Sequence, residues 1–286
     1  MSRPWRTIDS GLSTGAHNMA VDELLLTRVA ESGGAPVLRF YTWRPPAVSI
    51  GSNQTAATEL DLARCSQQGI DVVRRPSGGR AVLHWNELTY SLLWTEDEPS
   101  LAGGVSESCR RIGECLVAGL QLFGVAAELE QGDRGRGGAA PTSAASKGPC
   151  FASTSRWEIT CGGKKLVGSA QRRIRGGVLQ HGSLLLGPEH LRLGDLMRTD
   201  HVLPQTSTHL ACWVNHIDLE QLMESLLEGF ARTLDVDLEP TALSPEETAT
   251  AAQRAHRFSI APPLPPATTE HTSAETAIHG LVSQRT

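Results

Sequence analysis

The stretch RRPSGGRAVLHWNELTYS, residues 74–91, joins two β-like segments through a turn that holds two adjacent glycines. Gly78 and Gly79 have no Cβ, so the backbone of the turn can approach a ligand closely, and two arginines before them can act as donors. The spacing is neither that of a P-loop, GxxxxGK(S/T), nor that of a dinucleotide-binding turn, GxGxxG. Taken alone, the stretch is therefore either a ligand-binding turn or an ordinary glycine hairpin.

Outward from this turn, strands come in runs between amphipathic helices. Helices are predicted where apolar residues recur at three- and four-residue spacing, in residues 17–32, 58–69, 106–124 and 218–234. Strands are predicted for residues 37–43, 47–51, 71–75, 81–85, 87–94, 125–130, 155–161, 164–171 and 178–186, the first two of them hairpin-like. Because these elements do not alternate regularly as βαβ units, we expect an α+β fold with mixed or antiparallel sheets.

Composition excludes several classes of protein. The 286 residues are 40% hydrophobic, enough for a sizeable core, and the formal net charge is −5. A general nucleic-acid binder needs a basic surface to neutralise phosphates, which a net negative charge does not favour. No window offers the roughly 18 uncharged apolar residues of a membrane span, and the N-terminus lacks the apolar core of a signal peptide. We therefore expect a cytoplasmic protein that binds neither nucleic acid nor membrane.

The cysteines show no CxxC pair and no Cys/His ligand spacing, so we expect neither a metal site nor a disulfide framework. Cys150 differs from the rest, because it follows a Gly-, Ala- and Ser-rich loop over residues 131–148. A reactive thiol needs partial exposure and a positive field, which Lys147, Lys165 and Arg172 can supply. Cys150 is thus either a nucleophile or, like the other five cysteines, a reduced structural thiol.

The region after Cys150 holds further candidates. Gly168 and Gly182 interrupt β-like runs, and a glycine inside a strand marks either a bulge or the close approach of a ligand. Lys165 is either a solvated strand end or an inward-facing ammonium that can stabilise negative charge on a carbonyl oxygen. His181 by itself is more typical of a hydrogen-bonded core histidine than of a base.

Three motifs in this order, RRPSGGRAVLHWNELTYS, KLVGSAQRR and LQHGSLLL, resemble the superfamily of lipoate and octanoate protein ligases and transferases, which is related in fold to biotin protein ligases. The resemblance runs from about Trp5 to Leu234. Four segments are most similar to cysteine-dependent octanoyltransferases of the LipM type. They are GGRAVLH, NELTYS, the CF about fifteen residues ahead of KLVGSAQ, and LQHGS. Several motifs in order make the resemblance specific, although any single one would be weak.

The resemblance implies a biotin/lipoate protein ligase-like catalytic domain over residues 1–240, in which a large mixed sheet flanked by helices encloses an acyl-binding tunnel. Residues 241–286 are then a short helix, for which Ser244 to Glu247 form a capping box, and a mobile tail rich in Pro, Thr and Ala. That last helix is expected to run through about Arg257. The motif NMAVDE, residues 18–23, matches the N-terminal helix of the family and is expected to be structural.

The resemblance also assigns roles to individual residues. Cys150 becomes the nucleophile and Lys165 the residue that contacts the acyl carbonyl. The residues expected to line the substrate pocket are Arg74, Arg75, Ser77, Gly78, Gly79, Arg80, His84, Gly168, Ser169, Ala170, Gln171, His181 and Gly182.

The implied reaction moves an octanoyl group from acyl carrier protein through a Cys150 thioester to a lysine of a lipoyl domain. That domain belongs to the glycine cleavage H protein or to the acyltransferase subunit of a 2-oxoacid dehydrogenase. A thioester is already an activated acyl donor, so neither ATP nor another cofactor is expected. Arg172, Arg173 and Arg175 are either a patch that binds these acidic partners or a solvated strand end.

Three other functions, two enzymatic and one non-catalytic, remain open from the sequence alone. An ATP- and Mg²⁺-dependent lipoate-protein ligase would carry a third glycine in place of Arg80 and would not need Cys150. An amidotransferase would move octanoyl between two lipoyl-domain proteins, also through a cysteine. A non-catalytic module would retain only the pocket, although the presence of a cysteine and a lysine argues against it. Trp85 departs from the ligases, which often carry Asp after the histidine.

Overall fold

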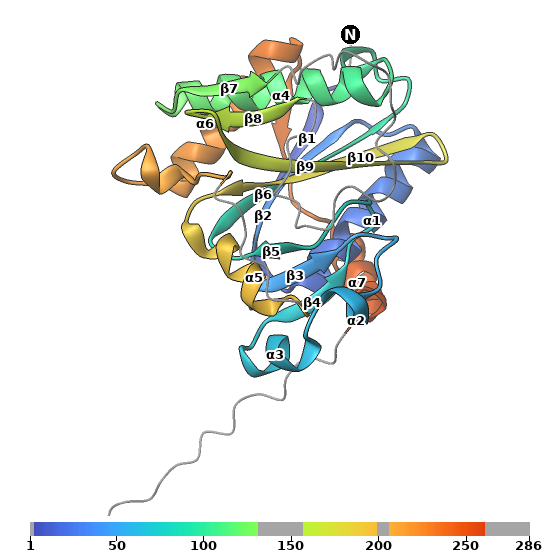
Figure 1. Cartoon of the computed structure of the whole chain (residues 1–286). Coiled ribbons are helices and arrows are strands. Elements are labelled where there is room, and N and C mark those ends of the chain that lie inside the picture. Colours follow the sequence, from blue (N-terminus) through green and yellow to red (C-terminus); the bar gives the residue numbers. More distant parts are fainter. Residues whose placement is uncertain (1–2, 131–156, 199–205, 261–286) are drawn as a thin grey trace, which may run out of the picture.

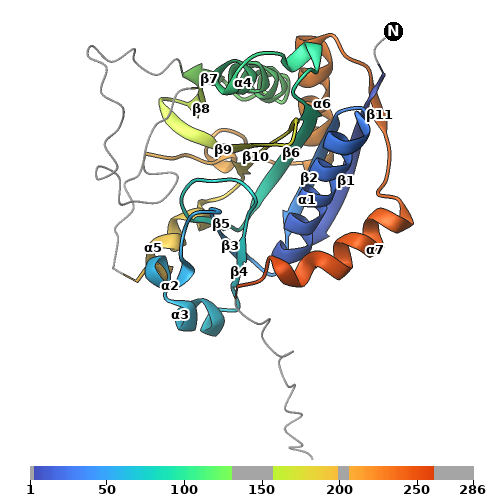
Figure 2. The ribbon, with the colours of Figure 1, turned by 90° about the vertical axis from the view of Figure 1, so that its right-hand side faces the viewer.

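The computed structural model describes residues 3–130, 157–198 and 206–260 (Figure 1). They form one large mixed sheet with helices on both faces and a small second sheet beside it (Figure 2). The α+β class expected from the sequence, with a large mixed sheet flanked by helices, is confirmed. None of these ranges contains a helix with the length and apolar character needed to cross a membrane.

The large sheet has eight strands in the order β11-β1-β2-β6-β10-β9-β8-β7. Strand β1 pairs in parallel with β2 and β11, and the other neighbours are antiparallel. The bounds are β1 Trp5–Ser13, β2 Val37–Trp43, β6 Glu87–Thr95, β7 Ala127–Glu130, β8 Glu158–Cys161, β9 Lys164–Ile174, β10 Gly177–Leu185 and β11 Leu238–Pro240.

The small sheet consists of β3 (Ala47–Ile50) between β4 (Asp71–Arg74) and β5 (Val82–His84). Strand β3 pairs in parallel with β4 and antiparallel with β5. Three short helices, α2 (Ala56–Glu59), α3 (Leu62–Gln67) and α5 (Leu193–Leu196), supply apolar residues to the core of this sheet.

Longer helices cover the two faces of the large sheet. Helices α4 (Val105–Leu122) and α6 (Leu219–Leu234) pack together over one face, and α1 (Gly15–Ser32) covers the other (Figure 2). Alternation along β6 serves both faces, because successive side chains of a strand point to opposite sides. Leu88, Tyr90 and Leu92 join the core under α4 and α6, whereas Leu93 joins the core under α1.

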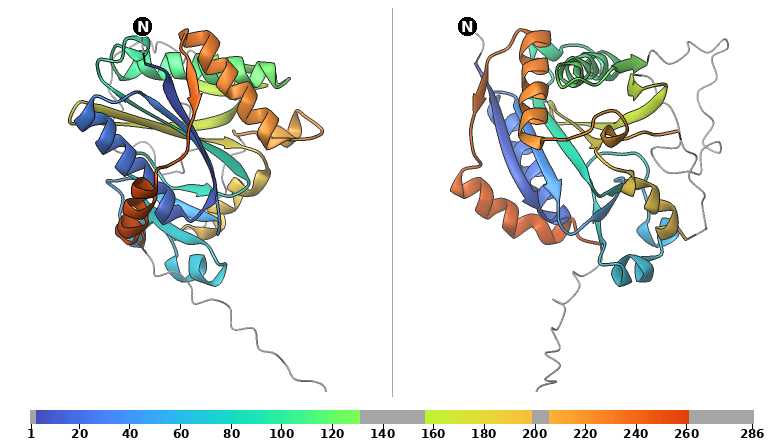
Figure 3. Two further views of the ribbon diagram at one scale, coloured as in Figure 1. Left: turned by 180° about the vertical axis from the view of Figure 1, so that it is seen from behind. Right: turned by 90° about the vertical axis from the view of Figure 1, so that its left-hand side faces the viewer.

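The C-terminal part of the described chain returns to the N-terminal strand (Figure 3). After β11, helix α7 (Pro245–Arg254) begins with the predicted capping box, in which Ser244 Oγ accepts from Glu247 N–H and Glu247 caps the Ser244 N–H. A turn of 3₁₀ helix then follows over Ala255–Arg257. Glu247 also forms an ion pair with Arg6 of β1 at 3.2 Å. The tail over residues 261–286 lies outside the described residues.

Several predicted details of the strands were wrong. Strand β1 was not expected, because its nine residues include Gly11 and Asp9 and alternate poorly. Strands β2 and β3 do not form a hairpin but belong to different sheets. Residues 76–80 do not form a hairpin either, since β4 and β5 each pair with β3 and the turn crosses between them.

The helix predicted over residues 58–69 is also interrupted. Leu60 is extended, with φ −116° and ψ 147°, and Asp61 then caps α3 by accepting from Arg64 N–H at 3.0 Å. An aspartate side chain at such a position competes with the helical hydrogen bonds of the backbone, which is why it starts a new helix. The helical spacing of apolar residues continues across this break, so the sequence pattern did not reveal it.

The contact between α4 and α6 depends on two facing glycines, and a methyl group there should destabilise the fold. A Cβ on Gly229 would lie 2.5 Å from the Cys115 carbonyl oxygen and from Gly119 N. Gly229→Ala should therefore lower the free energy of unfolding by about 1–3 kcal/mol, although alanine normally strengthens a helix. Chemical denaturation checks this, with exposed Glu224→Ala on the same helix as a control expected within about 0.5 kcal/mol of wild type. A stabilised Gly229→Ala would contradict the packing.

Candidate functional site

A small cavity lies between the large and small sheets, where α1 also contributes. Its volume is about 30 Å³, room for about one water molecule. It is lined by Met19, Tyr41, Trp43, Ser49, Arg75, Val82, His84, Thr89, Gly168, Ser169, Ala170, His181, Gly182 and Ser183. An eight-carbon chain therefore enters only if side chains move, and the acyl tunnel remains a prediction.

The residues predicted to line the substrate pocket do not all lie at this cavity. Seven of the motif residues line this cavity: Arg75, His84, Gly168, Ser169, Ala170, His181 and Gly182. Ser77 contacts the cavity through His181, because its Oγ lies 2.6 Å from His181 Nε2. Arg74 holds the backbone of residues 51–54, and Gln171 lies in a polar network with Gln180.

Arg75 holds the glycine-rich turn in place. Its guanidinium is buried and donates to the carbonyl oxygens of Ser49 at 3.0 Å, Gly78 at 2.8 Å and Arg80 at 2.7 Å. Gly79 has a φ of +96°, and a Cβ there would lie 2.8 Å from the Arg75 guanidinium. The left-handed backbone conformation, together with this close approach to Arg75, favours glycine at this position.

His181 on β10 is fixed by partners at both ring nitrogens. Nε2 lies 2.6 Å from Ser77 Oγ, and Nδ1 lies 3.2 Å from Asp22 Oδ2 on α1. Asp22 also accepts from Arg39 at 2.7 Å and from the Tyr41 hydroxyl at 2.9 Å. All these side chains are buried. The NMAVDE helix is thus structural as expected, but it also orients a histidine that lines the cavity.

The charge state of Asp22 follows from this arrangement. Burial alone would raise its pKa, but the hydrogen bond with His181 and the charge of Arg39 together lower the pKa below the ordinary value of 3.8. Asp22 is therefore an anion at neutral pH, paired with a fully buried guanidinium.

His84 is held in a similar way on the opposite wall. Its Nδ1 lies 2.8 Å from Glu87 Oε1 and its Nε2 lies 2.7 Å from Ser49 Oγ. Trp43 stacks on its ring with centroids 3.9 Å apart and an interplanar angle of 9°. Ser183 Oγ donates to the same Glu87 oxygen at 3.0 Å. Glu87 was not predicted, although a carboxylate inside an apolar strand was the available signal.

Lys165 is not a solvated strand end. The side chain is only 5% exposed, and Nζ lies 2.6 Å from Oε1 of Glu158, which is equally buried. The backbone of Lys165 donates to the Thr206 carbonyl at 2.9 Å and accepts from Thr208 N–H at 2.8 Å. The sequence analysis did not select Glu158, because a single glutamate within a predicted strand belongs to no motif. The ammonium predicted to contact the acyl carbonyl is therefore buried and ion-paired.

A polar network lies on the other face of β9 and β10, toward α4. Tyr90 OH is 2.8 Å from Ser169 Oγ and accepts from Gln180 Nε2 at 2.9 Å, while Gln171 donates to Gln180 at 3.0 Å. Gly182 packs against it, since a Cβ there would lie 2.6 Å from Ser169 Oγ and from Tyr90. The β9 and β10 pairing is continuous here, so the glycine allows a close approach and does not mark a bulge.

Cys150 lies outside the described residues. Burial raises the pKa of the Cys65 thiol to about 11, and burial also raises the pKa of Cys109 and Cys161. These thiols are protonated at neutral pH and are poor nucleophiles. Cys212 differs from the expectation of a buried thiol, because it is exposed and its Sγ lies 3.3 Å from His209 Nε2.

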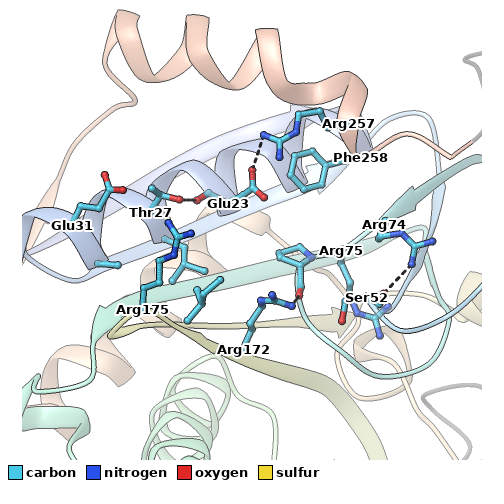
Figure 4. Close-up of a pocket in the computed structure, with 14 residues that line it drawn as sticks. Glu23, Thr27, Glu31, Ser52, Arg74, Arg75, Arg172, Arg175, Arg257 and Phe258 are labelled. Atoms are coloured by element: carbon cyan, nitrogen blue, oxygen red, sulfur yellow. Dashed lines mark hydrogen bonds and ion pairs between the residues drawn. The ribbon is translucent and has the colours of Figure 1, made fainter.

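A wider cleft of about 480 Å³ shares Arg75 with the small cavity (Figure 4). Arg172 and Arg175 border it from the hairpin of β9 and β10, and Arg257 pairs with Glu23 of α1 at 3.5 Å. Lys165 is not among its lining residues. Across the described ranges, no cluster of three or more His, Cys, Asp or Glu side chains is arranged to hold a metal ion.

Comparison with known proteins assigns the chain to a family. Residues 14–231 match the lipoyl protein ligase A/B catalytic domain, and the chain belongs to this family. It is similar to octanoyltransferase LipM of Kyrpidia tusciae, with 43% identity over 87% of this chain and 94% of the relative. It is also similar to octanoyltransferase LipM of Moorella thermoacetica, with 38% identity over 85% and 91% of the two chains.

Solved structures agree on the fold. A lipoate-protein ligase A bound with ATP superposes with a TM-score of 0.69 and 22% identity over 90% of this chain and 95% of that one. A lipoate protein ligase of T. acidophilum with bound lipoic acid gives a TM-score of 0.68 and 23% identity over 90% and 96%. The expected lipoate protein ligase fold is therefore confirmed.

Loss of the Asp22 charge should change both stability and its dependence on pH. Asp22→Asn leaves the Arg39 guanidinium buried without its anion, so the free energy of unfolding should fall by about 3–5 kcal/mol at neutral pH. Because the folded pKa of Asp22 is lowered, its stabilisation is complete above the unfolded value near 3.8 and is lost as pH falls through the folded pKa. Wild type should therefore lose stability on acidification more steeply than the variant.

Denaturant titrations between neutral pH and about pH 3 measure this difference. Glu23→Gln provides a matched control, because Glu23 neighbours Asp22 on α1 but is partly exposed and forms its ion pair with the exposed Arg257 at 3.5 Å. It should cost at most about 1 kcal/mol. Equal pH slopes for wild type and Asp22→Asn would contradict the assigned charge state.

Proposed function

We propose that this protein is an octanoyl-acyl carrier protein:protein N-octanoyltransferase of lipoate biosynthesis. One observation carries the proposal: the buried Lys165 ammonium stands at the start of β9 in a chain 43% identical, over 87% of its length, to an octanoyltransferase. Octanoyltransferase LipM of Lysinibacillus sphaericus is 36% identical over 85% of this chain. The reaction is proposed to take place in the cytoplasm.

In the first step, the Cys150 thiolate attacks the thioester carbonyl of octanoyl-acyl carrier protein. A new S–C bond forms, the bond to the carrier sulfur breaks, and the carrier leaves as a thiol with the proton that Cys150 gave up. The tetrahedral intermediate carries its negative charge on oxygen, where the Lys165 ammonium stabilises it. One thioester replaces another, so the exchange has little thermodynamic cost and is proposed to need neither ATP nor another cofactor.

In the second step, the lysine amine of a lipoyl domain attacks the octanoyl thioester on Cys150. The C–N bond forms, the C–S bond breaks, and the amine proton returns to Cys150 as the thiol. The acceptor is the glycine cleavage H protein or the acyltransferase subunit of a 2-oxoacid dehydrogenase. A solved structural neighbour at 20% identity is a bi-partite lipoate protein ligase from Thermoplasma acidophilum, described together with its E2 lipoyl domain.

The octanoyl tail is proposed to occupy the cavity between the two sheets. Gly168 adds no side chain to its wall, and the stacked Trp43 and His84 rings border it. Entry of the chain requires these side chains to shift, given the cavity of about 30 Å³. For the acidic partners, Arg175 is the exposed member of the proposed arginine patch, whereas Arg172 is half-buried and donates to the Pro76 carbonyl.

Intact-protein mass spectrometry tests the function directly. The protein is mixed with octanoyl-acyl carrier protein without ATP, and apo lipoyl domain is added afterwards. A hydroxylamine-labile octanoyl adduct that moves to the lipoyl domain supports the transferase. Acylation only with free lipoate and MgATP, and no adduct without them, would instead identify an ATP-dependent ligase. Octanoyl-H protein as the donor distinguishes an amidotransferase.

Substitution of the proposed nucleophile should remove transfer without unfolding the protein. Cys150→Ala should give no adduct and no octanoylated lipoyl domain, with an unchanged thermal unfolding midpoint. Cys161→Ala is the control, because Cys161 is buried and its thiol pKa is raised by burial, so its transfer rate should stay near wild type. The reverse pattern would reject Cys150 as the nucleophile.

Removal of the Lys165 ammonium should slow acylation. A single oxyanion donor in an active site is worth roughly 100-fold or more in rate, so Lys165→Ala should lower the rate of adduct formation by about that factor. Neighbouring Lys164→Ala is the matched control, since its side chain is exposed, and should retain the wild-type rate. Wild-type acylation by Lys165→Ala would remove Lys165 from the mechanism.

A further inference from the structure

The ion pair between Glu158 and Lys165 crosses from β8 to β9 at an irregularity of the sheet. Ile159 pairs with Val167, and a regular antiparallel register would then place Thr160 opposite Leu166. The structure instead pairs Thr160 with Lys165, so β9 contains one extra residue at this point.

The extra residue decides which face of the sheet Lys165 occupies. With a regular register, Lys165 would lie opposite Cys161 and point into the apolar core beneath α4, where Cys161 and Ile159 are buried. The shift places it opposite Thr160, whose side chain shares a face with that of Glu158 two residues away. A local departure from regular pairing therefore brings the ammonium to the carboxylate.

Because both side chains are buried, the Glu158 carboxylate determines where the Lys165 ammonium can lie. Each side chain of the pair is 5% exposed, and the two charged atoms lie 2.6 Å apart. Removal from water disfavours a charged amine, and a nearby anion favours it. Breaking a buried ion pair by removing one partner is strongly unfavourable, so each group depends on the other for its position. Glu158 therefore bears on where the Lys165 ammonium lies.

We propose that Glu158 is a positioning residue of the transfer site, which holds and directs the Lys165 ammonium across the register shift between β8 and β9. This inference rests on the proposed function, in which Lys165 stabilises the oxyanion. Glu158 itself forms no bond to the acyl group and transfers no proton. The described chain resumes at Trp157 after the segment that contains Cys150, so Glu158 lies eight positions downstream of the nucleophile in sequence.

Step-resolved kinetics of matched variants test the proposal. Glu158→Gln keeps the size of the side chain and removes its charge, and Glu158→Asp keeps the charge. The rate of adduct formation at saturating octanoyl donor should fall about 10- to 100-fold in Glu158→Gln, with KM within about twofold of wild type, and should recover in part in Glu158→Asp. Glu128→Gln, an exposed carboxylate on β7, should remain at the wild-type rate.

A double variant separates positioning from a general structural effect. If Glu158 acts through Lys165, the rates of Lys165→Ala and of Glu158→Gln/Lys165→Ala should be equal. Independent, multiplying losses would overturn the proposal, as would wild-type acylation by Glu158→Gln. Thermal unfolding midpoints show whether each variant is folded. If Glu158→Gln does not fold, Glu158→Asp is compared with and without Lys165→Ala in its place.

A second readout does not require activity. Trace acetylation with acetic anhydride reports how firmly each amine is held by its neighbours, and the exposed Lys164 provides an internal reference. The labelling of Lys165 relative to Lys164 should rise severalfold in Glu158→Gln and stay near wild type in Glu128→Gln. An unchanged ratio would overturn the proposal. If wild type forms no octanoyl adduct at all, the proposed function fails, and the labelling ratio still decides the role of Glu158.

Discussion

Asp22 joins parts of the chain that are far apart in sequence. From α1, its carboxylate accepts from Arg39 and Tyr41 of β2 and contacts His181 of β10. Through His181 the connection reaches Ser77 in the glycine-rich turn. A buried anion needs several donors at defined positions, so one helix, two strands and one turn are held in a single arrangement. The cavity between the sheets is bordered by these same elements.

The two faces of the large sheet carry different side chains around β10. Toward α4 and α6, the strands contribute a broad apolar core with Leu88, Leu92 and Val178. Toward the small sheet they present His181, Ser183 and other polar side chains that hold one another through short contacts. His181 and Ser183 lie on β10, which is paired along its length with β6 and β9. The backbone that carries them is therefore held by both neighbours, whereas the side chains that line the small cavity must shift before an eight-carbon chain can enter.

The fold class and most elements could be predicted from the sequence, because periodicity and turn residues are local signals. The break at Asp61 and the strand β1 could not, since the first depends on one capping side chain and the second includes Asp9 and Gly11 and alternates poorly. Among the site residues, motif resemblance placed His84 and His181 near one another. It did not reveal Glu158 or the register shift at Lys165, because a one-residue change in strand pairing has no sequence pattern of its own.

The return of the chain to its own first strand has a consequence for how the protein is made. Arg6 of β1 bonds to Thr241, 235 positions later, and β11 completes the outer side of β1. During synthesis the edge of β1 at Trp5 to Thr7 therefore stays unpaired until β11 has been made. Contacts of such long range slow folding and prolong the exposure of strand edges. A strand made late in synthesis is thus the one that pairs with the outer edge of β1.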